Sequence, residues 1–168
     1  MSTGTPLDNY YESDPLYTEI LPGLFLGGTA SSDTIFTSAD ARKAFDDLNF
    51  QSVITMFYAA NPCGFNSHEM RYHIVDGLLD TVDMARLGEI VSWGHSRWSK
   101  NNDILLCRCQ AGINRSAFTV ALILIKEGYT AVDAIELIRS KRFSYCLSNE
   151  HYEKWLLENG EEFVRNLR

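Results

Sequence analysis

The chain has 168 residues, of which 45% are hydrophobic and 22% are charged, a composition typical of one folded globular domain. Its formal net charge of −7 argues against a general nucleic-acid surface or a surface for anionic membranes. No stretch approaches the roughly 18 apolar residues of a membrane span, and we expect no signal peptide. Because no signal peptide is expected, we expect the four cysteines to be reduced thiols. We also expect a cytoplasmic monomer.

The first third of the chain predicts a tail, two strands, a helix and a third strand. Residues 1–17 are polar, so we expect a loosely ordered tail before a single domain over residues 18–168. Residues 19–28 predict two short strands around a Pro-Gly turn. Residues 38–48 have the apolar spacing of a helix, and residues 52–57 are rich in β-branched residues typical of a buried strand.

The rest of the chain continues to alternate between predicted strands and helices. Strands are expected at 71–75 and 103–107, and helices at 82–98, at 116–127 and after the capping residues Thr130 and Asn149. Gly128 should end the central helix, for which Ser116 is a candidate N-cap. This alternation predicts an α/β fold with a central, mostly parallel, twisted sheet of about five strands flanked by helices.

One segment joins the predicted strand 103–107 to the apolar central helix and is the most informative part of the chain. It reads Cys109-Gln110-Ala111-Gly112-Ile113-Asn114-Arg115-Ser116. A strand, a tight loop and a helix in this order aim backbone N–H groups and a helix N-terminus at one point, where an anion binds. A thiol in such a place tends to react as its thiolate, so Cys109 is a candidate nucleophile.

The residue types of this loop suit a phosphate monoester. We expect the backbone of Gln110, Ala111, Gly112, Ile113, Asn114 and Arg115 to bind its oxygens. Glycine at position 112 permits the turn, and the planar fork of Arg115 can hold two phosphate oxygens. A hydrogen bond from Ser116 would favour the thiolate of Cys109, which attacks phosphorus to form a cysteinyl-phosphate.

The leaving oxygen needs a proton, and Asp76 is the favoured donor. It follows the predicted strand 71–75, at the sheet edge where ligands bind in such folds. Asp80 and Asp83 lie just beyond it and remain alternatives. No metal or other cofactor is expected, since Cys107 and Cys109 have only one residue between them and no second ligand pair follows.

On these residues the chain resembles the cysteine-dependent phosphatases, and specifically the dual-specificity phosphatase group. The signature of that group, Cys-x-x-Gly-x-x-Arg-Ser/Thr, is met by Cys109, Gly112, Arg115 and Ser116. The resemblance covers residues 18–163 and includes His73-Ile74-Val75-Asp76, which is similar to the segment that carries the general acid of the family. It implies a protein tyrosine phosphatase-like fold and Asp76 as the general acid.

Three further residues gain a meaning from the resemblance. The family usually has His before the nucleophile, whereas this chain has Arg108, which either supplies positive charge or points to solvent. Asn149 lies where the family often has an Asn that orders the active-site loop or the hydrolytic water, and a plain helix cap is the alternative. By analogy, Cys63 is a candidate to trap an oxidised Cys109 as a disulfide.

The resemblance implies a phosphorylated protein as substrate. The default is phosphotyrosine, alone or together with phosphoserine and phosphothreonine, and a small phosphoester is the other substrate class. The uncharged loop residues weaken the alternative of a phosphoinositide phosphatase, whose relatives carry Lys there. The Gly-x-Asn-Arg arrangement is similar to that of RNA 5′-triphosphatases, but the acidic charge speaks against that substrate. A phosphate-binding pseudophosphatase is the third alternative.

Overall fold

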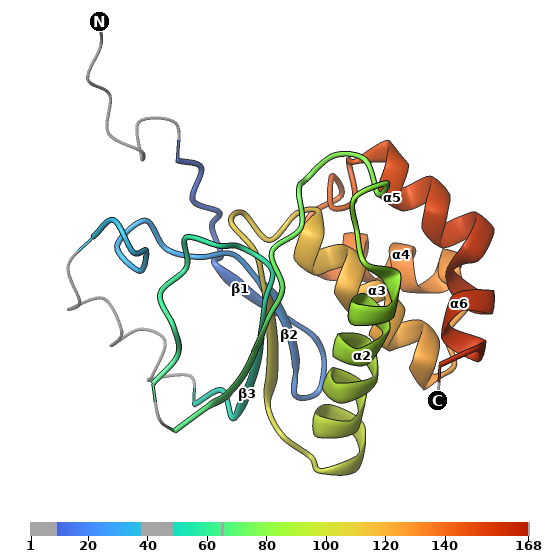
Figure 1. Cartoon of the computed structure of the whole chain (residues 1–168), viewed down its shortest axis with the longest axis horizontal. Coiled ribbons are helices and arrows are strands. Elements are labelled where there is room, and N and C mark those ends of the chain that lie inside the picture. Colours follow the sequence, from blue (N-terminus) through green and yellow to red (C-terminus); the bar gives the residue numbers. More distant parts are fainter. Residues whose placement is uncertain (1–9, 38–48, 65, 168) are drawn as a thin grey trace, which may run out of the picture.

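The structure is a computed structural model that describes residues 10–37, 49–64 and 66–167 (Figure 1). The helix expected over residues 38–48 lies outside the described residues. The described strands are β1 (Tyr17–Leu21), β2 (Leu24–Gly27), β3 (Ser52–Thr55), β4 (His68–Arg71) and β5 (Leu105–Arg108). The described helices are α2 (Met84–His95), α3 (Arg115–Glu127), α4 (Ala131–Lys141), α5 (Glu150–Trp155) and α6 (Glu161–Arg165), with π-helical turns η2 (Ser96–Lys100) and η3 (Leu156–Gly160).

The strands form one sheet in the order β1-β2-β5-β3-β4. β1 and β2 are antiparallel, whereas the three other neighbouring pairs are parallel. The prediction of a mostly parallel five-stranded sheet flanked by helices is therefore confirmed. Because β5 is the central strand, the loop that follows it emerges in the middle of one sheet edge.

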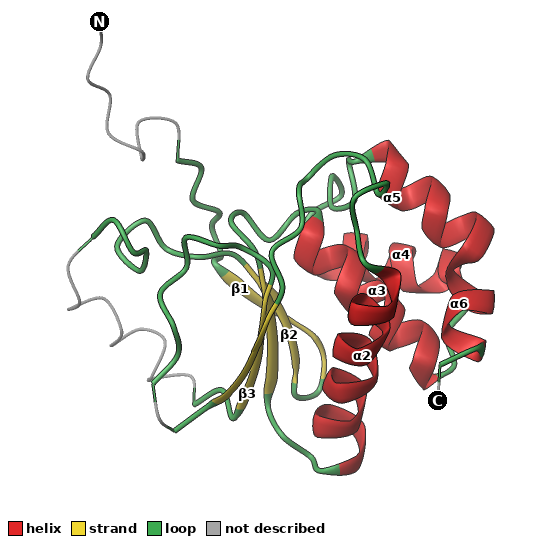
Figure 2. Cartoon of the chain, viewed as in Figure 1, coloured by secondary structure: helices red, strands yellow, loops and turns green. Residues whose placement is uncertain are grey.

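The described helices gather on one face of the sheet (Figures 1 and 2). α3 lies innermost, and its side chains are buried from Arg115 to Ile125, as expected for a helix that is apolar on nearly all sides. Alternating residues of β5 divide the sheet into two faces: Leu105 and Cys107 join the core under the helices, while Leu106 joins a smaller cluster on the other face. Each described helix is too short or too polar to cross a lipid bilayer.

Most of the predicted helix ends are confirmed. Thr130 caps α4 by accepting from the backbone N–H of Asp133, and Asn149 caps α5 by accepting from the backbone N–H of His151. Gly128 follows the last residue of α3 with a φ of 124°, a left-handed conformation that favours glycine. The suggestion that Ser116 caps the central helix is wrong, because the helix begins at Arg115 and its N-cap is Asn114.

The strand expected at residues 71–75 lies earlier in the chain. β4 spans His68–Arg71 at the edge of the sheet, and Tyr72 to Val75 continue outside any strand. The apolar alternation that suggested the strand belongs to this following segment, in which Ile74 is buried against the core and Val75 is exposed. Asp76 is therefore not at a strand end, and side-chain contacts rather than sheet hydrogen bonds must hold it.

The described part of the N-terminal segment, residues 10–16, is hydrogen-bonded to the domain, unlike the loose tail expected for it. The hydroxyl of Tyr10 donates to the carbonyl of Thr29. The guanidinium of Arg142 donates to the carbonyl of Pro15 over 3.0 Å and to the hydroxyl of Ser13 over 2.8 Å.

Candidate active site

The Cys109–Asn114 loop follows β5 at the carboxyl edge of the sheet, between the parallel neighbours β2 and β3. Gly112 has a φ of +67°, and a Cβ atom there would lie 2.5 Å from the carbonyl carbon of Gly27. A Cβ at Gly28 would lie 2.6 Å from the carbonyl oxygen of Gln110. The loop thus packs directly on the end of β2, which only glycine permits at both positions.

The sulfur of Cys109 lies at the floor of this loop, and the residue is 2% exposed. The backbone N–H of Gly112 donates to Sγ over 3.3 Å. The hydroxyl of Ser116 lies 3.1 Å from the same sulfur. The carbonyl of Cys109 accepts a hydrogen bond from the Thr29 hydroxyl over 2.8 Å, which holds the backbone of the loop at this residue.

Arg115 begins α3, and its buried side chain reaches across the site. Its Nη1 donates to the carbonyl of Ile74 over 3.4 Å, and its guanidinium lies 5.4 Å from the centre of the Phe57 ring. The ring and the carbonyl orient the fork and leave most of its N–H donors for a bound oxyanion.

A cavity of about 260 Å³ joins the loop to Asp76. Its described lining consists of Tyr11, Asp76, Cys109, Gln110, Ala111, Ile113, Asn114, Arg115, Tyr145 and Ser148. Asp76, Cys109 and Arg115 therefore meet at one place although they are far apart in the sequence. Asp80 is not among these lining residues, and Asp83 is engaged in capping α2 through the N–H of Arg86.

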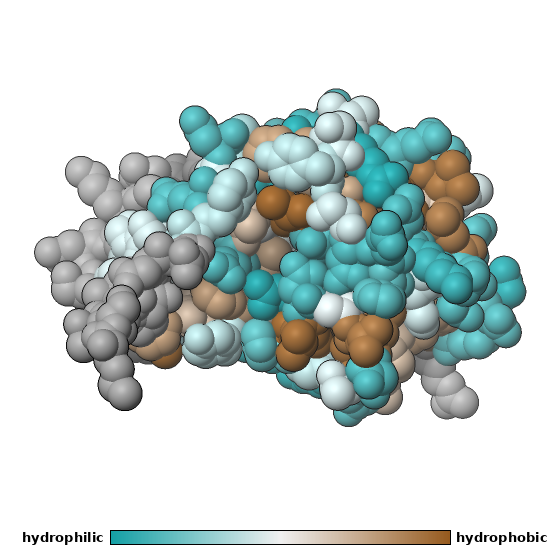
Figure 3. Space-filling model, turned by 90° about the horizontal axis from the view of Figure 1, so that it is seen from above, coloured by the Kyte–Doolittle hydropathy of each residue, from teal (hydrophilic) through white to brown (hydrophobic). Residues whose placement is uncertain are grey.

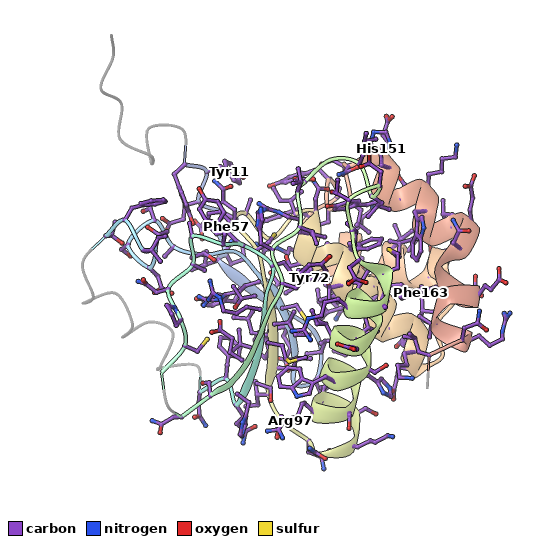
Figure 4. All side chains as sticks on the ribbon, viewed as in Figure 1. Tyr11, Phe57, Tyr72, Arg97, His151 and Phe163 are labelled. Carbon is purple, nitrogen blue, oxygen red and sulfur yellow. The ribbon has the colours of Figure 1, made fainter. Side chains whose placement is uncertain are left out.

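The start of α5 lies at the upper edge of the molecule in Figure 1, and Figure 3 views that edge face on, with hydrophilic and hydrophobic residues both exposed there. Tyr11 from the N-terminal segment and His151 from α5 both lie along it (Figure 4). The hydroxyls of Tyr11 and Tyr145 are 3.5 Å apart, and Tyr145 stacks on Phe143 with ring centres 4.9 Å apart. The mouth of the cavity thus has an aromatic wall.

Arg142, which the sequence did not point to, supports the loop from behind. It follows α4, and its Nε donates to the carbonyl of Gly112 over 2.8 Å. Its Nη1 also donates to the hydroxyl of Thr18 over 2.8 Å. No local pattern marks such a residue, because it lies 30 positions from the carbonyl that it binds.

Arg108 does not point to solvent, so that alternative drawn from the sequence is wrong. It is 1% exposed and forms ion pairs with Asp33 at 3.1 Å and Glu69 at 3.3 Å. Its Nε also donates to the hydroxyl of Thr55 over 3.0 Å. Because side chains alternate along a strand, Arg108 lies on the sheet face opposite to Cys107 and Cys109.

Cys63 belongs to the surroundings of Arg108, with its Sγ 3.3 Å from a carboxylate oxygen of Glu69. Burial raises the pKa of Cys63 to about 12, and the charge of Arg108 offsets part of this effect. The thiol is therefore protonated at neutral pH, which makes it a slow partner for disulfide formation. All four cysteines are free thiols.

A larger cavity, of about 480 Å³, lies at the opposite end of the sheet around Trp98 and Tyr129. Its carboxylate Glu127 is engaged by His95 at 2.6 Å and by the hydroxyl of Ser99 at 2.9 Å. The described lining of this cavity contains no cysteine, whereas the smaller cavity contains Cys109 and is the candidate site. Among the described residues, no group of three His, Cys, Asp or Glu side chains is placed to hold a metal.

Comparison with known proteins agrees with this architecture. No family model matches the sequence, and no curated protein matches it. Solved structures do match: a mouse protein described as a dual specificity phosphatase, complexed with zinc tungstate, has a TM-score of 0.72 and 17% identity, covering 98% of this chain and 95% of that chain. Human DUSP28 has a TM-score of 0.70 and 17% identity, with 88% of this chain and 97% of that chain covered.

A further match is PTPMT1 in complex with PI(5)P, with a TM-score of 0.66 and 22% identity, covering 90% of this chain and 96% of that chain. At these identities the likeness concerns the fold, and the chain has the fold of the dual-specificity phosphatases. The resemblance inferred from the Cys109–Ser116 motif is confirmed at that level.

Proposed function

We propose that this chain is a cysteine-dependent phosphatase that hydrolyses phosphate monoesters through a cysteinyl-phosphate. The observation that carries the proposal is the meeting of Cys109, Arg115 and Asp76 in one cavity of about 260 Å³. The sulfur accepts from the Gly112 N–H, and the Ser116 hydroxyl lies 3.1 Å from it, where it can donate to a nucleophilic thiolate. A nucleophile, an oxyanion clamp and a carboxyl group within one pocket are the parts that phosphoryl transfer requires.

In this mechanism the phosphate ester is hydrolysed in two steps. The thiolate of Cys109 attacks phosphorus, the S–P bond forms, and the P–O bond to the alcohol breaks as Asp76 gives its proton to the leaving oxygen. In the second step the ionised Asp76 takes a proton from water, which attacks phosphorus and breaks the S–P bond. Loop N–H groups and Arg115 stabilise the charge on the equatorial oxygens in both steps.

We further propose that the substrate is a phosphotyrosine-containing protein, with phosphoserine and phosphothreonine as the extension of that class. The walls formed by Tyr11 and Tyr145 offer ring surfaces against which a phenyl group packs. A phosphoinositide is the alternative, since PTPMT1 was solved with PI(5)P. Against it, one residue of the described lining is a cation, Arg115, and one is an acid, Asp76, a poor complement for a polyanion.

The test is hydrolysis of an aryl phosphate, with a phosphotyrosine peptide, a phosphoinositide and a triphosphate-ended RNA as further substrates. Wild type should release phosphate with inhibition by vanadate, and Cys109→Ser should lose activity by at least about a thousandfold because no thiolate remains. Asp76→Asn should retain phosphate binding and turn over slowly. A wild-type protein that binds vanadate but hydrolyses none of the substrates would contradict the proposal and favour a phosphate-binding pseudophosphatase.

A further inference from the structure

Asp76 is held by two amide side chains that come from different parts of the chain. Its Oδ1 accepts from Nδ2 of Asn149 over 2.9 Å, and its Oδ2 accepts from Nδ2 of Asn114 over 3.1 Å. Asn114 belongs to the loop of Cys109, and Asn149 is the N-cap of α5. Each carboxylate oxygen therefore has one fixed donor.

The two amides are also joined to each other. The backbone N–H of Asn149 donates to Oδ1 of Asn114 over 2.9 Å. Because Oδ1 of the Asn114 amide accepts this bond, the amide nitrogen Nδ2 is turned toward Asp76 and donates to it. The loop, the α5 N-terminus and Asp76 thus form one connected unit, which we call the amide clamp: Asp76, Asn114 and Asn149.

The clamp is needed because nothing in the sheet fixes Asp76, which lies beyond the end of β4. The adjoining backbone is held by the same helix: Nδ2 of Asn149 donates to the carbonyl of Gly77 over 3.0 Å, and the hydroxyl of Tyr152 donates to the carbonyl of Val75 over 2.5 Å. Burial, together with the charge of Asp76, raises the pKa of Tyr152, so that this hydroxyl stays protonated as a donor.

The clamp leaves room for acid chemistry. An ionised carboxylate offers about four lone-pair sites, and the two amides occupy two of them. A proton on a remaining site faces the cavity that Asp76 shares with Cys109. Fixing both oxygens sets the direction of that site, and orientation of a reacting group is worth large factors in rate.

We propose that Asn114 and Asn149 are positioning residues that aim the carboxyl group of Asp76 at the leaving oxygen. This inference rests on the proposed phosphatase function and assigns to Asn149 a task beyond capping α5. It separates acid catalysis from stability, because the cap uses Oδ1 of Asn149 and the clamp uses Nδ2.

The test uses Asn149→Ser, since serine is as good an N-cap as asparagine but is too short to reach Asp76. The quantity is kcat/KM for two aryl phosphates: 4-nitrophenyl phosphate, whose acidic phenol leaves without a proton, and phenyl phosphate, whose phenol needs one. We expect a loss of about tenfold on phenyl phosphate and of less than about threefold on the nitrophenyl ester, because only the former depends on the general acid. In an Asp76→Asn background the substitution should cause no further loss on either ester.

Thr130→Ala is the matched control, because it removes the side-chain cap of α4 without touching the cavity. It should change both esters equally, or neither. Equal losses on the two esters in Asn149→Ser, or a loss that persists in the Asp76→Asn background, would overturn the inference while leaving the phosphatase function intact. A wild-type protein inactive on both esters would instead overturn the proposed function, and with it this role of the clamp.

Discussion

At the scale of single residues, Arg108 is the least expected feature of the site. It directly precedes the nucleophile, yet its side chain extends to the other face of the sheet, where Asp33 and Glu69 pair with it. Burial works to raise the pKa of Glu69, but a hydrogen bond from Thr55 and the charges of Arg108 and Arg71 outweigh it, and the net shift is downward. The charge of Arg108 is thus largely committed to this network, beneath the strand that carries Cys109.

Removing the charge of Arg108 should destabilise the fold. Arg108→Met should lower the free energy of unfolding by about 3 kcal/mol, since it removes the guanidinium from the buried carboxylates of Asp33 and Glu69, of which Glu69 keeps its ion pair with Arg71. Arg86→Met, which breaks the exposed pair with Glu89, should cost less than about 1 kcal/mol. Urea denaturation at pH 7 measures both, and equal costs would show that the Arg108 pairs contribute no more than a surface pair.

The same network predicts a direction for pH. Because the folded-state pKa of Glu69 is depressed, its contribution to stability is present above the unfolded value of about 4.3 and is lost as the pH falls through the folded value. The difference between wild type and Arg108→Met should therefore shrink as the denaturation is repeated at increasingly acidic pH.

At the scale of elements, the sequence was most informative where local chemistry decides the structure. The buried strands β3 and β5, the apolar helix α3 and the caps Thr130 and Asn149 follow from short runs of β-branched or other apolar residues, periodicity and capping side chains. The loop of Cys109 was also predictable, since glycine, arginine and a helix start lie within eight residues of sequence.

Contacts between elements that are distant in the chain could not be predicted from the sequence. β4 is an edge strand of mixed, half-exposed residues, so its pattern is weak and the prediction moved to the apolar residues after it. The contacts of Asn149 with Asp76, and of Arg142 with Gly112, span 73 and 30 positions. Such side-chain bonds leave no periodicity in the sequence.

The element-scale prediction concerns Arg142, whose guanidinium ties α4, the N-terminal segment and the Cys109 loop together. Arg142→Lys keeps the charge but loses the planar fork, so fewer of these carbonyls and hydroxyls retain a donor. We expect kcat/KM for an aryl phosphate to fall roughly tenfold, with weaker inhibition by vanadate, because the loop loses its support. The control Arg86→Lys should be neutral, and an unaltered vanadate affinity in Arg142→Lys would contradict the role of Arg142.

For the whole molecule, the negative net charge and the groove beside the active site together affect which peptides bind. A second groove, of about 360 Å³, shares Asp76, Asn114 and Ser148 with the cavity of Cys109. It continues to Glu150 and His151 on α5. A peptide whose phosphorylated residue enters the cavity would therefore place a neighbouring residue near Glu150, in a molecule whose net charge is −7.

This arrangement predicts a preference for basic residues beside the phosphorylated residue. A single exposed charge pair is worth about 1 kcal/mol, so we expect a lysine-flanked phosphotyrosine peptide to exceed a glutamate-flanked one roughly fivefold in kcat/KM at low salt. The preference should shrink as salt screens the charges. Glu150→Lys should abolish or reverse it, whereas Glu158→Lys, an identical change of net charge on η3 outside the groove, should retain most of it. If both variants behave alike, the preference reflects the overall charge of the molecule, and the groove does not contribute to the choice of peptide.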